Sequence, residues 1–407
     1  MKYGNWPSIL TIYLFGVLGA ATTSKIIPLQ TLFDGLGAGP RLFSWMLALI
    51  GLPAAVLAVA SGVVADRIGA RRFLLISAAV GCAANAGYLV ASSAAPFVIG
   101  RLIEGLALIG IFTAAPALLM GTTEGRRRVS AMTLWSTYSP AGVSLGFALG
   151  AASAARHSLH LVFAAHGALF AMVLLAGIAL PASSLPPATA RHSVRERLTA
   201  LIDAYRQPRI VRLAIGFFLI LSVAFGMSMV LPGYFGRIHG ISAAHASAIL
   251  SGSNLAMIPG SFAAGALLAR GNRAVIVFSI TALPALLAGL TLLWPGTSPE
   301  LLVPALCIWS LCLGSATATF LTSLPIVADP ARLGAAAGLF AQAGAMATLL
   351  NPPLWLAILA SGRWGLFLVL LVFGWSAALL LLHQAIRAGD DPLTLSISLE
   401  GVPAARG

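Results

Sequence analysis

Twelve apolar stretches, each about as long as a membrane is thick, constrain this chain more than any other feature. A helix needs about 20 apolar residues to cross the hydrocarbon core of a bilayer. The stretches lie at 9–33, 41–65, 73–94, 95–121, 129–153, 158–180, 210–235, 244–269, 274–294, 301–327, 335–361 and 364–387. Only 9% of the residues are charged, whereas a soluble domain carries about a quarter, so lipid must solvate most of the surface. We therefore predict an all-α membrane protein with twelve transmembrane helices.

The basic residues predict the orientation of these helices. With both termini on one side, eighteen of the 24 lysines and arginines fall on that side. The opposite side receives only Arg41, Arg156, Arg237 and Arg363. Because loops on the cytoplasmic face are enriched in Lys and Arg, we expect a multi-pass protein of a bacterial inner membrane with cytoplasmic termini. The net charge of +13 then reflects loop orientation and does not indicate a nucleic-acid partner.

The chain also repeats itself at an offset of about half its length. IIPLQTLFDGLG (26–37) matches MVLPGYFGRIHG (229–240) in pattern, with Pro28 and Pro232 within one position of each other. Paired six-helix halves of this kind are a known transporter construction. The predicted parts are an N-terminal bundle at 1–180, a cytoplasmic linker at 181–209 with a short amphipathic helix at about 193–206, a C-terminal bundle at 210–387 and a cytoplasmic tail at 388–407. A signal peptide at the N-terminus is an alternative, but the first stretch is longer than a secretory h-region.

Two short motifs carry a resemblance to a known family. GVVADRIGARR (62–72) resembles the G-x-L-A-D-R-x-G-R-K signature of the major facilitator superfamily, except for an alanine where an arginine is usual. RLIEGLALIG (101–110) resembles the family's second motif, R-x-x-Q-G-x-G, with glutamate at the glutamine position. The third motif, a Gly-Pro-rich run typical of antiporters, is poorly matched by SPAGVSLGFALG (139–150). The resemblance implies twelve helices in two pseudo-symmetric six-helix bundles around a central cavity.

The first motif implies a gate on the cytoplasmic side. Because a carboxylate pairs with nearby guanidinium groups, Asp66 is expected to hold a neighbouring arginine-rich loop and to release it when the halves move. The loop at 126–128 offers three such arginines. The alternative is a tight glycine turn whose arginines serve only to orient the helices. The residues that match the motif, and to which the resemblance assigns gating, are Gly62, Asp66, Arg67, Gly69 and Arg71.

Three charges lie inside the apolar stretches, well away from the ends of those stretches. Lys25 is the only charge between Ile9 and Phe33, and Arg101 and Glu104 lie in the fourth stretch. At about 1.5 Å per residue, all three fall at a similar depth in the outer half of the membrane. Charges at such a depth are costly and usually pair or line a pathway. Since the first and fourth helices line the cavity in the superfamily, the resemblance implies that these charges share one space.

The chemistry of these charges suggests their roles. Glu104 follows Arg101 by three positions and shares its helical face, so a pair would leave Lys25 in surplus. We expect Lys25 and Arg101 to bind the anionic part of a substrate. Glu104, the only acid in any stretch, is expected to carry the proton. The alternatives are a Lys25 that snorkels to the interface and an Arg101–Glu104 pair that only stabilises the N-terminal half.

Neutral residues complete the candidate binding site, because the C-terminal stretches carry no charge away from their ends. The candidates are Tyr138, Asn254 and Gln342. Interfacial anchoring is the alternative for Tyr138, and hydrogen bonding between helices is the alternative for the other two. His166, in the sixth stretch, is more typical of a hydrogen-bonded interior histidine than of a proton carrier.

Together these features indicate a secondary active transporter. We expect proton-coupled alternating access that moves a small anionic or zwitterionic organic solute, with efflux of a metabolite, siderophore or drug favoured. Import of an organic anion or amino acid is the alternative. An integral membrane enzyme is remote, because H-E-x-x-H and paired acids are absent. The chain lacks a G-x-x-x-x-G-K-[ST] loop for ATP and cysteines at paired spacing, so we expect no cofactor, metal or disulfide. The expected partners are the substrate, protons and the lipid bilayer, with the chain acting as a monomer.

Overall fold

The computed structural model describes residues 5–181, 194–328 and 333–387 of the 407-residue chain. The N-terminal half contains α1 (Trp6–Ser24), η1 (Ile27–Leu29), α2 (Gln30–Asp34), α3 (Pro40–Ala48), η2 (Leu49–Gly51), α4 (Leu52–Ile68), α5 (Ala70–Leu89), α6 (Ala94–Thr122), α7 (Gly125–Trp135), α8 (Tyr138–Ala155) and α9 (Leu159–Gly177). Helix α10 (Val194–Tyr205) follows, which confirms the short helix predicted in the linker. The C-terminal half contains α11 (Pro208–His239), α12 (Ala243–Asn254), α13 (Met257–Ala269), α14 (Ala274–Leu293), α15 (Pro299–Val327), α16 (Leu333–Ser361) and α17 (Gly365–Arg387).

Eleven helical segments within the described residues are long and apolar enough to cross a membrane. They correspond to eleven of the twelve predicted stretches. The remaining stretch, 129–153, is formed by α7 and α8, with a break at Ser136 and Thr137. Its glycines and serines lower its mean hydropathy, and it is not among the eleven. Because α8 packs against α1 and α12, it lies inside the bundle and completes the predicted all-α fold of twelve passes.

Two of the predicted stretches are interrupted next to a proline. The stretch 9–33 turns at η1, which contains Pro28, and the stretch 41–65 turns at η2, just before Pro53. Proline lacks an N–H and therefore removes an intrahelical hydrogen bond. Such breaks are tolerated inside a membrane where neighbouring groups satisfy the freed backbone atoms. η1 begins two residues after Lys25, and η2 contacts α6, which carries Arg101 and Glu104.

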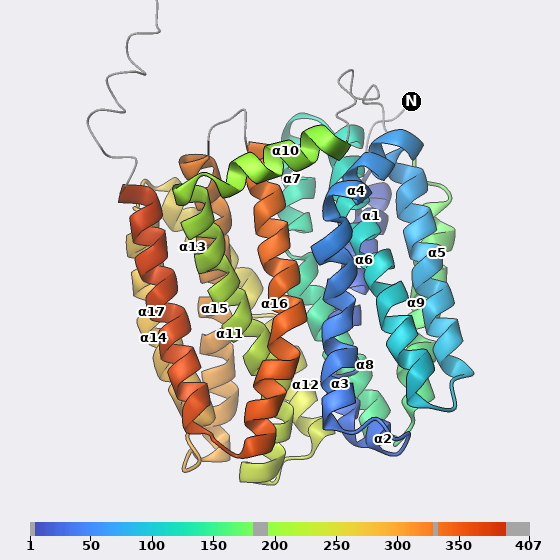
Figure 1. Cartoon of the computed structure of the whole chain (residues 1–407), viewed down its shortest axis with the longest axis vertical. Helices are drawn as coiled ribbons and strands as arrows, with labels where there is room; N and C mark the ends of the chain where they lie inside the picture. Colours follow the sequence, from blue (N-terminus) through green and yellow to red (C-terminus); the bar gives the residue numbers. More distant parts are fainter. Residues whose placement is uncertain (1–4, 182–193, 329–332, 388–407) are drawn as a thin grey trace, which may run out of the picture.

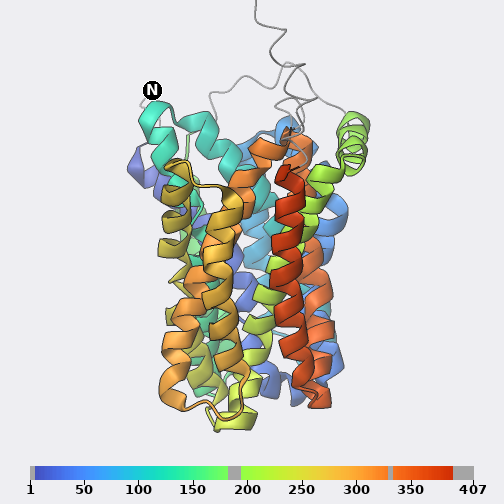
Figure 2. The same ribbon diagram turned by 90° about the vertical axis from the view of Figure 1, so that its left-hand side faces the viewer.

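The two halves stand side by side as two helical bundles (Figure 1). Turning the molecule by 90° shows that the helices of both bundles run along its long axis (Figure 2). α1 begins and α17 ends at the same end of the molecule, where α10 contacts α4, α11 and α16. We call this end the linker end. The bundle limits at 1–180 and 210–387 stay predictions, and the tail at 388–407 lies outside the described residues.

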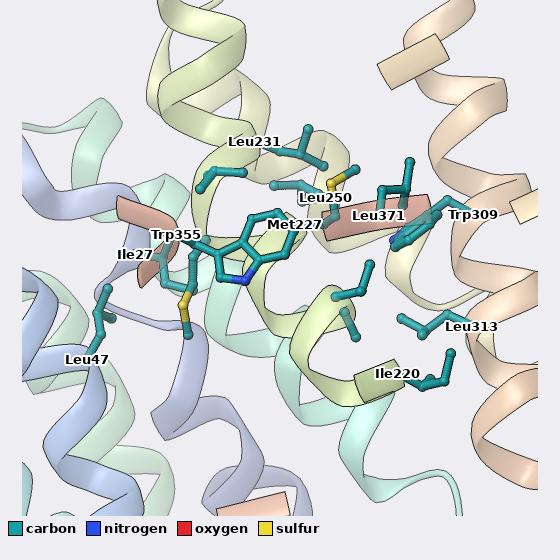
Figure 3. Packing of buried hydrophobic residues seen from close by; sticks show 14 of the residues in the cluster. Ile27, Leu47, Ile220, Met227, Leu231, Leu250, Trp309, Leu313, Trp355 and Leu371 are labelled. Carbon is teal, nitrogen blue, oxygen red and sulfur yellow. The ribbon is translucent and has the colours of Figure 1, made fainter. Parts of the chain in front are cut away.

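The halves pack against each other through α8 with α12, and through α16 with α3 and α4. Ile27 and Leu47 of the N-terminal half belong to the same buried apolar cluster as Met227 and Trp355 of the C-terminal half (Figure 3). The part of the N-terminal half that contains Ile9, near the linker end, has a separate apolar core. The two halves are therefore closed against each other at the end opposite the linker end.

Candidate functional site

Lys25 lies directly after α1, where the glycines of α8 bring these two helices close together. The glycines that face α1 are Gly142, Gly146 and Gly150. A Cβ atom at Gly150 would lie 2.5 Å from the carbonyl oxygen of Lys25. The hydroxyl of Ser24 donates to a carbonyl of α8 at 2.9 Å. Small residues allow helices to approach closely in a membrane. The run at 139–150, which matches the third family motif poorly, therefore packs closely against α1 and fixes the position of Lys25 at its end.

The ammonium group of Lys25 has three partners, each on a different helix of the N-terminal half. Nζ lies 2.5 Å from Oε1 of Glu104 on α6, 2.6 Å from Oδ1 of Asn85 on α5 and 2.9 Å from Nδ1 of His166 on α9. An ammonium group has three N–H donors, so its hydrogen-bonding capacity is met. Lys25 is 0% exposed, which contradicts the alternative in which its side chain snorkels to the membrane surface.

Glu104 joins Lys25 to Arg101. Its Oε2 accepts a hydrogen bond from Nη1 of Arg101 at 2.5 Å and another from the hydroxyl of Tyr88 at 3.0 Å. The Arg101 and Glu104 side chains are 1% and 2% exposed. Hydrogen bonds between ionised groups are about twice as strong as neutral ones. Lys25, Arg101 and Glu104 thus form one enclosed unit, which we call the charge cluster.

The charge cluster holds more positive than negative charge. Two cations, Lys25 and Arg101, are paired with a single carboxylate, that of Glu104. Nη2 of Arg101 is buried and has no hydrogen-bond partner within the described residues. A buried donor without a partner is costly, and more so on a charged group. The cluster therefore has the capacity to take up a further negatively charged or hydrogen-bond-accepting group.

Arg101 also connects the charge cluster to the break between α3 and α4. Its Nε donates to the carbonyl of Met46 at 2.9 Å, and its Nη1 donates to the carbonyl of Thr22 at 3.1 Å. Gly105 lets α6 approach the same break, since a Cβ atom there would lie 2.6 Å from the carbonyl oxygen of Ile50. The glycine of the second motif is thereby explained by close packing of α6 against η2.

The structure brings together the three charges that the sequence singled out, but it encloses them inside the N-terminal half. Every partner named above lies on α1, α3, α5 or α6, or on α9. A gap lined by Thr22, Asn85 and Glu104 borders the cluster, but it is too narrow for a water molecule. The expected central cavity is therefore not open to these side chains in this conformation, and their contact with a substrate stays a prediction.

Asn254 bridges the two halves. Its Nδ2 donates to the carbonyl of Pro140 at 2.9 Å and to the hydroxyl of Ser144 at 3.3 Å, both on α8. Nearby, the hydroxyl of Ser251 on α12 donates to the carbonyl of Ser144 at 2.8 Å. These bonds correspond to the alternative of hydrogen bonding between helices. Asn254 therefore helps to close the interface between α8 and α12, and its contact with a substrate is untested.

The other two neutral candidates also have partners outside the charge cluster. Gln342 on α16 accepts a hydrogen bond from the hydroxyl of Tyr205 on α10 at 2.6 Å, which ties the linker helix to the C-terminal half. Tyr138 at the start of α8 is half-buried, and its ring stacks on that of Trp135 at 4.4 Å and lies 5.0 Å from that of Phe112. Substrate contacts of Gln342 and Tyr138 stay predictions.

The gating motif forms the sharp connection between α4 and α5. Gly69 has φ 88°, a conformation that glycine adopts without strain. Arg71 donates to the carbonyl of Ile178 just after α9, and Arg67 is exposed. The side chain of Asp66 lies outside the described part of the structure, so its pairing with a neighbouring loop stays a prediction. The observed role of the motif is to join α4, α5 and α9 at the linker end.

Asn85 and Tyr88 belong to the site but were not predicted from the sequence. They are three residues apart on α5 and therefore share a helical face. Nδ2 of Asn85 donates to the carbonyl of Gly81 at 2.8 Å, which aims Oδ1 at Lys25. The signal that could have identified them in the sequence is that they are polar residues in an apolar stretch at the same depth as Lys25. His166 is an interior hydrogen-bonded histidine, as expected from the sequence.

A fold of two helical bundles with buried charges defines a multi-pass membrane transport protein. The chain belongs to the Major Facilitator Superfamily, whose family model matches residues 9–352. This match confirms the family that the two sequence motifs indicated. No curated protein is similar enough in sequence to count as a relative.

Several solved structures share the fold at low sequence identity. A point mutant of the nucleoside transporter NupG is 16% identical, with 93% of this chain and 99% of that chain covered and a TM-score of 0.73. A bacterial homolog of the human lysosomal transporter Spinster, inward-facing and unoccupied, is 14% identical, with 94% and 99% covered and a TM-score of 0.74. The human organic anion transporter MFSD10 is 18% identical, with 91% and 99% covered and a TM-score of 0.65. These similarities show the fold alone.

Proposed function

We propose that this protein is a proton-coupled secondary transporter of a small anionic or zwitterionic organic solute. The observation that supports the proposal most is the enclosed charge cluster, in which two cations are paired with one carboxylate. Ionisable residues inside membrane segments are costly and are usually retained where ions or solutes pass. Membership of a transporter family points in the same direction and away from an enzyme.

Glu104 is the proton-binding group of this proposal. Its carboxylate accepts hydrogen bonds from Lys25, Arg101 and Tyr88. Protonation would remove the only negative charge of the cluster and leave two buried cations without a counter-ion, which is strongly unfavourable. A substrate carboxylate or phosphate that binds next to Nη2 of Arg101 would restore the balance. Binding of a proton and binding of an anion thus favour each other, and by linkage the effect is reciprocal.

This mutual preference indicates symport of a proton with an anion. A carrier in which protons and substrate bind together moves both in the same direction, and a bacterial proton gradient drives that movement inward. The electrostatics of the cluster therefore favour uptake of an organic anion or amino acid, the alternative left open by the sequence, over the efflux by antiport that was expected first. The weak match to the antiporter motif at 139–150 agrees with this preference.

The orientation of the protein follows from its loop charges. The excess of basic residues on the side of the termini supports a cytoplasmic linker end in a bacterial inner membrane. Since the halves are closed against each other at the opposite end, this conformation has its periplasmic side shut. The state that admits substrate from outside would require the interface between α8 and α12 to separate. We propose that a single chain carries out this cycle as a monomer.

Uptake into proteoliposomes tests the proposal. The probes are radiolabelled gluconate as an anion, glutamate as a zwitterion with net negative charge, and choline as a cation. We expect gluconate or glutamate to accumulate when the outside is made acidic, and choline not to accumulate. Glu104→Gln should abolish the response to the gradient, because an amide cannot bind the proton. The matched control is Glu300→Gln, at an exposed acid in the first turn of α15.

Each outcome bears on a separate part of the proposal. Uptake of choline alone would refute the anionic substrate class. Accumulation driven by protons that leave the vesicle would refute symport and restore antiport. Flux without any response to the gradient would refute proton coupling. Because Glu104→Gln leaves two cations unpaired, its rates are compared per folded protein together with those of Glu104→Gln/Lys25→Met, in which one surplus cation is removed.

A further inference from the structure

The hydrogen bonds of His166 determine where its proton lies. The residue is 0% exposed on α9. Its Nε2 is 3.0 Å from the carbonyl oxygen of Leu18, and its Nδ1 is 2.9 Å from Nζ of Lys25. A carbonyl oxygen can only accept a hydrogen bond, so Nε2 carries the proton. Nδ1 then presents its lone pair to the ammonium group of Lys25.

We propose that Lys25 and His166 form a proton-exchange pair, in which His166 is the base that accepts a proton from Lys25 during transport. This inference rests on the proposed proton coupling and adds a second proton-binding residue to it. In the step, the bond between Nζ of Lys25 and one hydrogen breaks, and a bond between that hydrogen and Nδ1 of His166 forms. Lys25 becomes a neutral amine and His166 an imidazolium, so the charge of the pair is unchanged.

Every hydrogen bond of the pair survives this step without movement of a side chain. Before it, Nζ donates to Asn85, Glu104 and His166. After it, Nζ keeps two hydrogens for Asn85 and Glu104, and its lone pair accepts the new Nδ1–H of His166. The bond from Nε2 to Leu18 is the same in both states. The site therefore accommodates the proton on Nζ of Lys25 or on Nδ1 of His166. A histidine with a purely structural role would not need both arrangements.

The other titratable groups around the pair give the step a direction. On α6, the carboxylate of Glu104 stabilises the positive charge of Lys25, and the guanidinium of Arg101 destabilises it. On α5, Tyr88 donates its hydroxyl hydrogen to Glu104 and is not a base for Lys25. When Glu104 is protonated, its hold on the ammonium charge is lost. Lys25 can then pass its own proton to His166. Once His166 has released that proton, the lone pair of Nζ is free to take the proton of Glu104, so one proton enters the cluster and one leaves it through His166.

The surroundings of His166 indicate that a proton would leave this residue toward the linker end. The ring of Phe170, one turn further along α9, lies 4.9 Å from the imidazole. Phe170 also lines the narrow gap beside Glu104, together with Gly19 of α1 and Ile111 of α6. Gly19 precedes Lys25 on α1 and Ile111 follows Glu104 on α6, so the gap extends from the cluster toward the linker end. A proton on His166 would leave on that side when the gap widens.

Two measurements on the full chain test the inference. The first is nitrogen NMR of the protein in lipid nanodiscs, in which lysine and histidine carry ¹⁵N. The chain has only two lysines, Lys2 and Lys25, so the lysine spectrum is simple. We expect an unprotonated Nδ1 in His166 that shows a coupling across the hydrogen bond to Nζ of Lys25, and we expect His166→Asn to abolish it. The spectrum needs no substrate.

The second measurement compares gradient-driven uptake with counterflow, using gluconate or glutamate. In His166→Asn the amide oxygen can accept from Lys25 but cannot bind a proton, so gradient-driven uptake should fall about tenfold or more, and counterflow far less. Lys25→Arg keeps the charge but cannot release a proton. It should therefore also lose far more of its gradient-driven uptake than of its counterflow. The control is His160→Asn, at an exposed histidine on α9, which should match the wild type.

Three results would overturn the inference, and the first two do so without touching the proposed proton coupling. One is a protonated Nδ1 in His166, or no coupling to Lys25. Another is gradient-driven uptake by His166→Asn at the wild-type rate, which would reduce the contact to a structural hydrogen bond. A wild type that exchanges the probe but ignores the gradient would refute the proposed proton coupling itself, and this inference with it. The spectrum decides the pairing even if neither probe is carried.

Discussion

The hydrogen bonds that Asn254 makes across the interface should determine how firmly the two halves close. Asn254→Ala removes the bond to Pro140 at 2.9 Å and the longer bond to Ser144 at 3.3 Å. The bond from Ser251 to the carbonyl of Ser144 remains. A hydrogen bond between membrane helices contributes about 0.6 kcal/mol on average and up to about 1.7 kcal/mol. The expected loss from both bonds is therefore about 1–2 kcal/mol of preference for the closed state.

A loss of this size is large for a two-state equilibrium. One to two kcal/mol changes a population ratio by roughly 5–30-fold, so a closed state that dominates in the wild type should share the ensemble with an open one in Asn254→Ala. The assay is a distance measurement between spin labels on cysteines introduced at Arg41 and Arg363, in a background without the native cysteines. Both positions are exposed and lie at the end opposite the linker end. We expect a new population at longer distance.

The control for this experiment is Asn272→Ala. The amide of Asn272 donates at 2.8 Å to the carbonyl of Leu267, in the last turn of the preceding helix α13, so its loss should leave the distance distribution unchanged. If Asn254→Ala gave the wild-type distribution as well, the two bonds of Asn254 would not hold the halves closed at the end opposite the linker end. The closure would then rest on the bond of Ser251 and on the contacts of α16 with α3 and α4.

Two further predictions concern stability and are checked by thermal unfolding in detergent. Glu104→Gln leaves two buried cations without a counter-ion and should destabilise the fold by about 3–5 kcal/mol. Adding Lys25→Met removes one of these cations and should recover much of the lost stability. A double variant that is no more stable than Glu104→Gln would contradict the charge balance derived for the cluster. Gly314→Val places a side chain against the carbonyl of Met257, where α15 crosses α13, and should lower the unfolding temperature strongly. Gly87→Val, at a helical glycine with open space around it, should have little effect, and equal losses in both variants would refute the close crossing.

The fold was predictable because membrane helices must be long and apolar. The twelve stretches follow from this rule, the amphipathic pattern at about 193–206 predicted the linker helix, and the two motifs indicated the family. The breaks at η1 and η2 were not predicted, since a proline such as Pro28 can kink a helix or end it, and neighbouring backbone groups decide which. The stretch 129–153 was predicted as one helix, whereas it is broken at Ser136 and Thr137.

The members of the charge cluster were predictable, but their surroundings were not. Lys25, Arg101 and Glu104 stand out because charges are rare in such segments. Depth can be counted from helix ends, whereas the rotation of α1 and α6 about their axes cannot, because both helices are apolar on every side. The direction of Lys25 toward α5 and α9 is therefore information that only the structure supplies. Asn85 escaped notice because a neutral amide is far more common in membrane helices than a charge.

The low hydropathy of α8 has a consequence for how the chain is made. A segment with so many glycines and serines gains little from contact with lipid, so on leaving the ribosome it would partition poorly into the bilayer alone. Its glycine face fits α1, which is synthesised earlier and is already in place. We expect α8 to stay in the membrane only because it packs against α1. Bulky replacements along that face would then show first as failed insertion during biosynthesis, before any effect on the finished carrier.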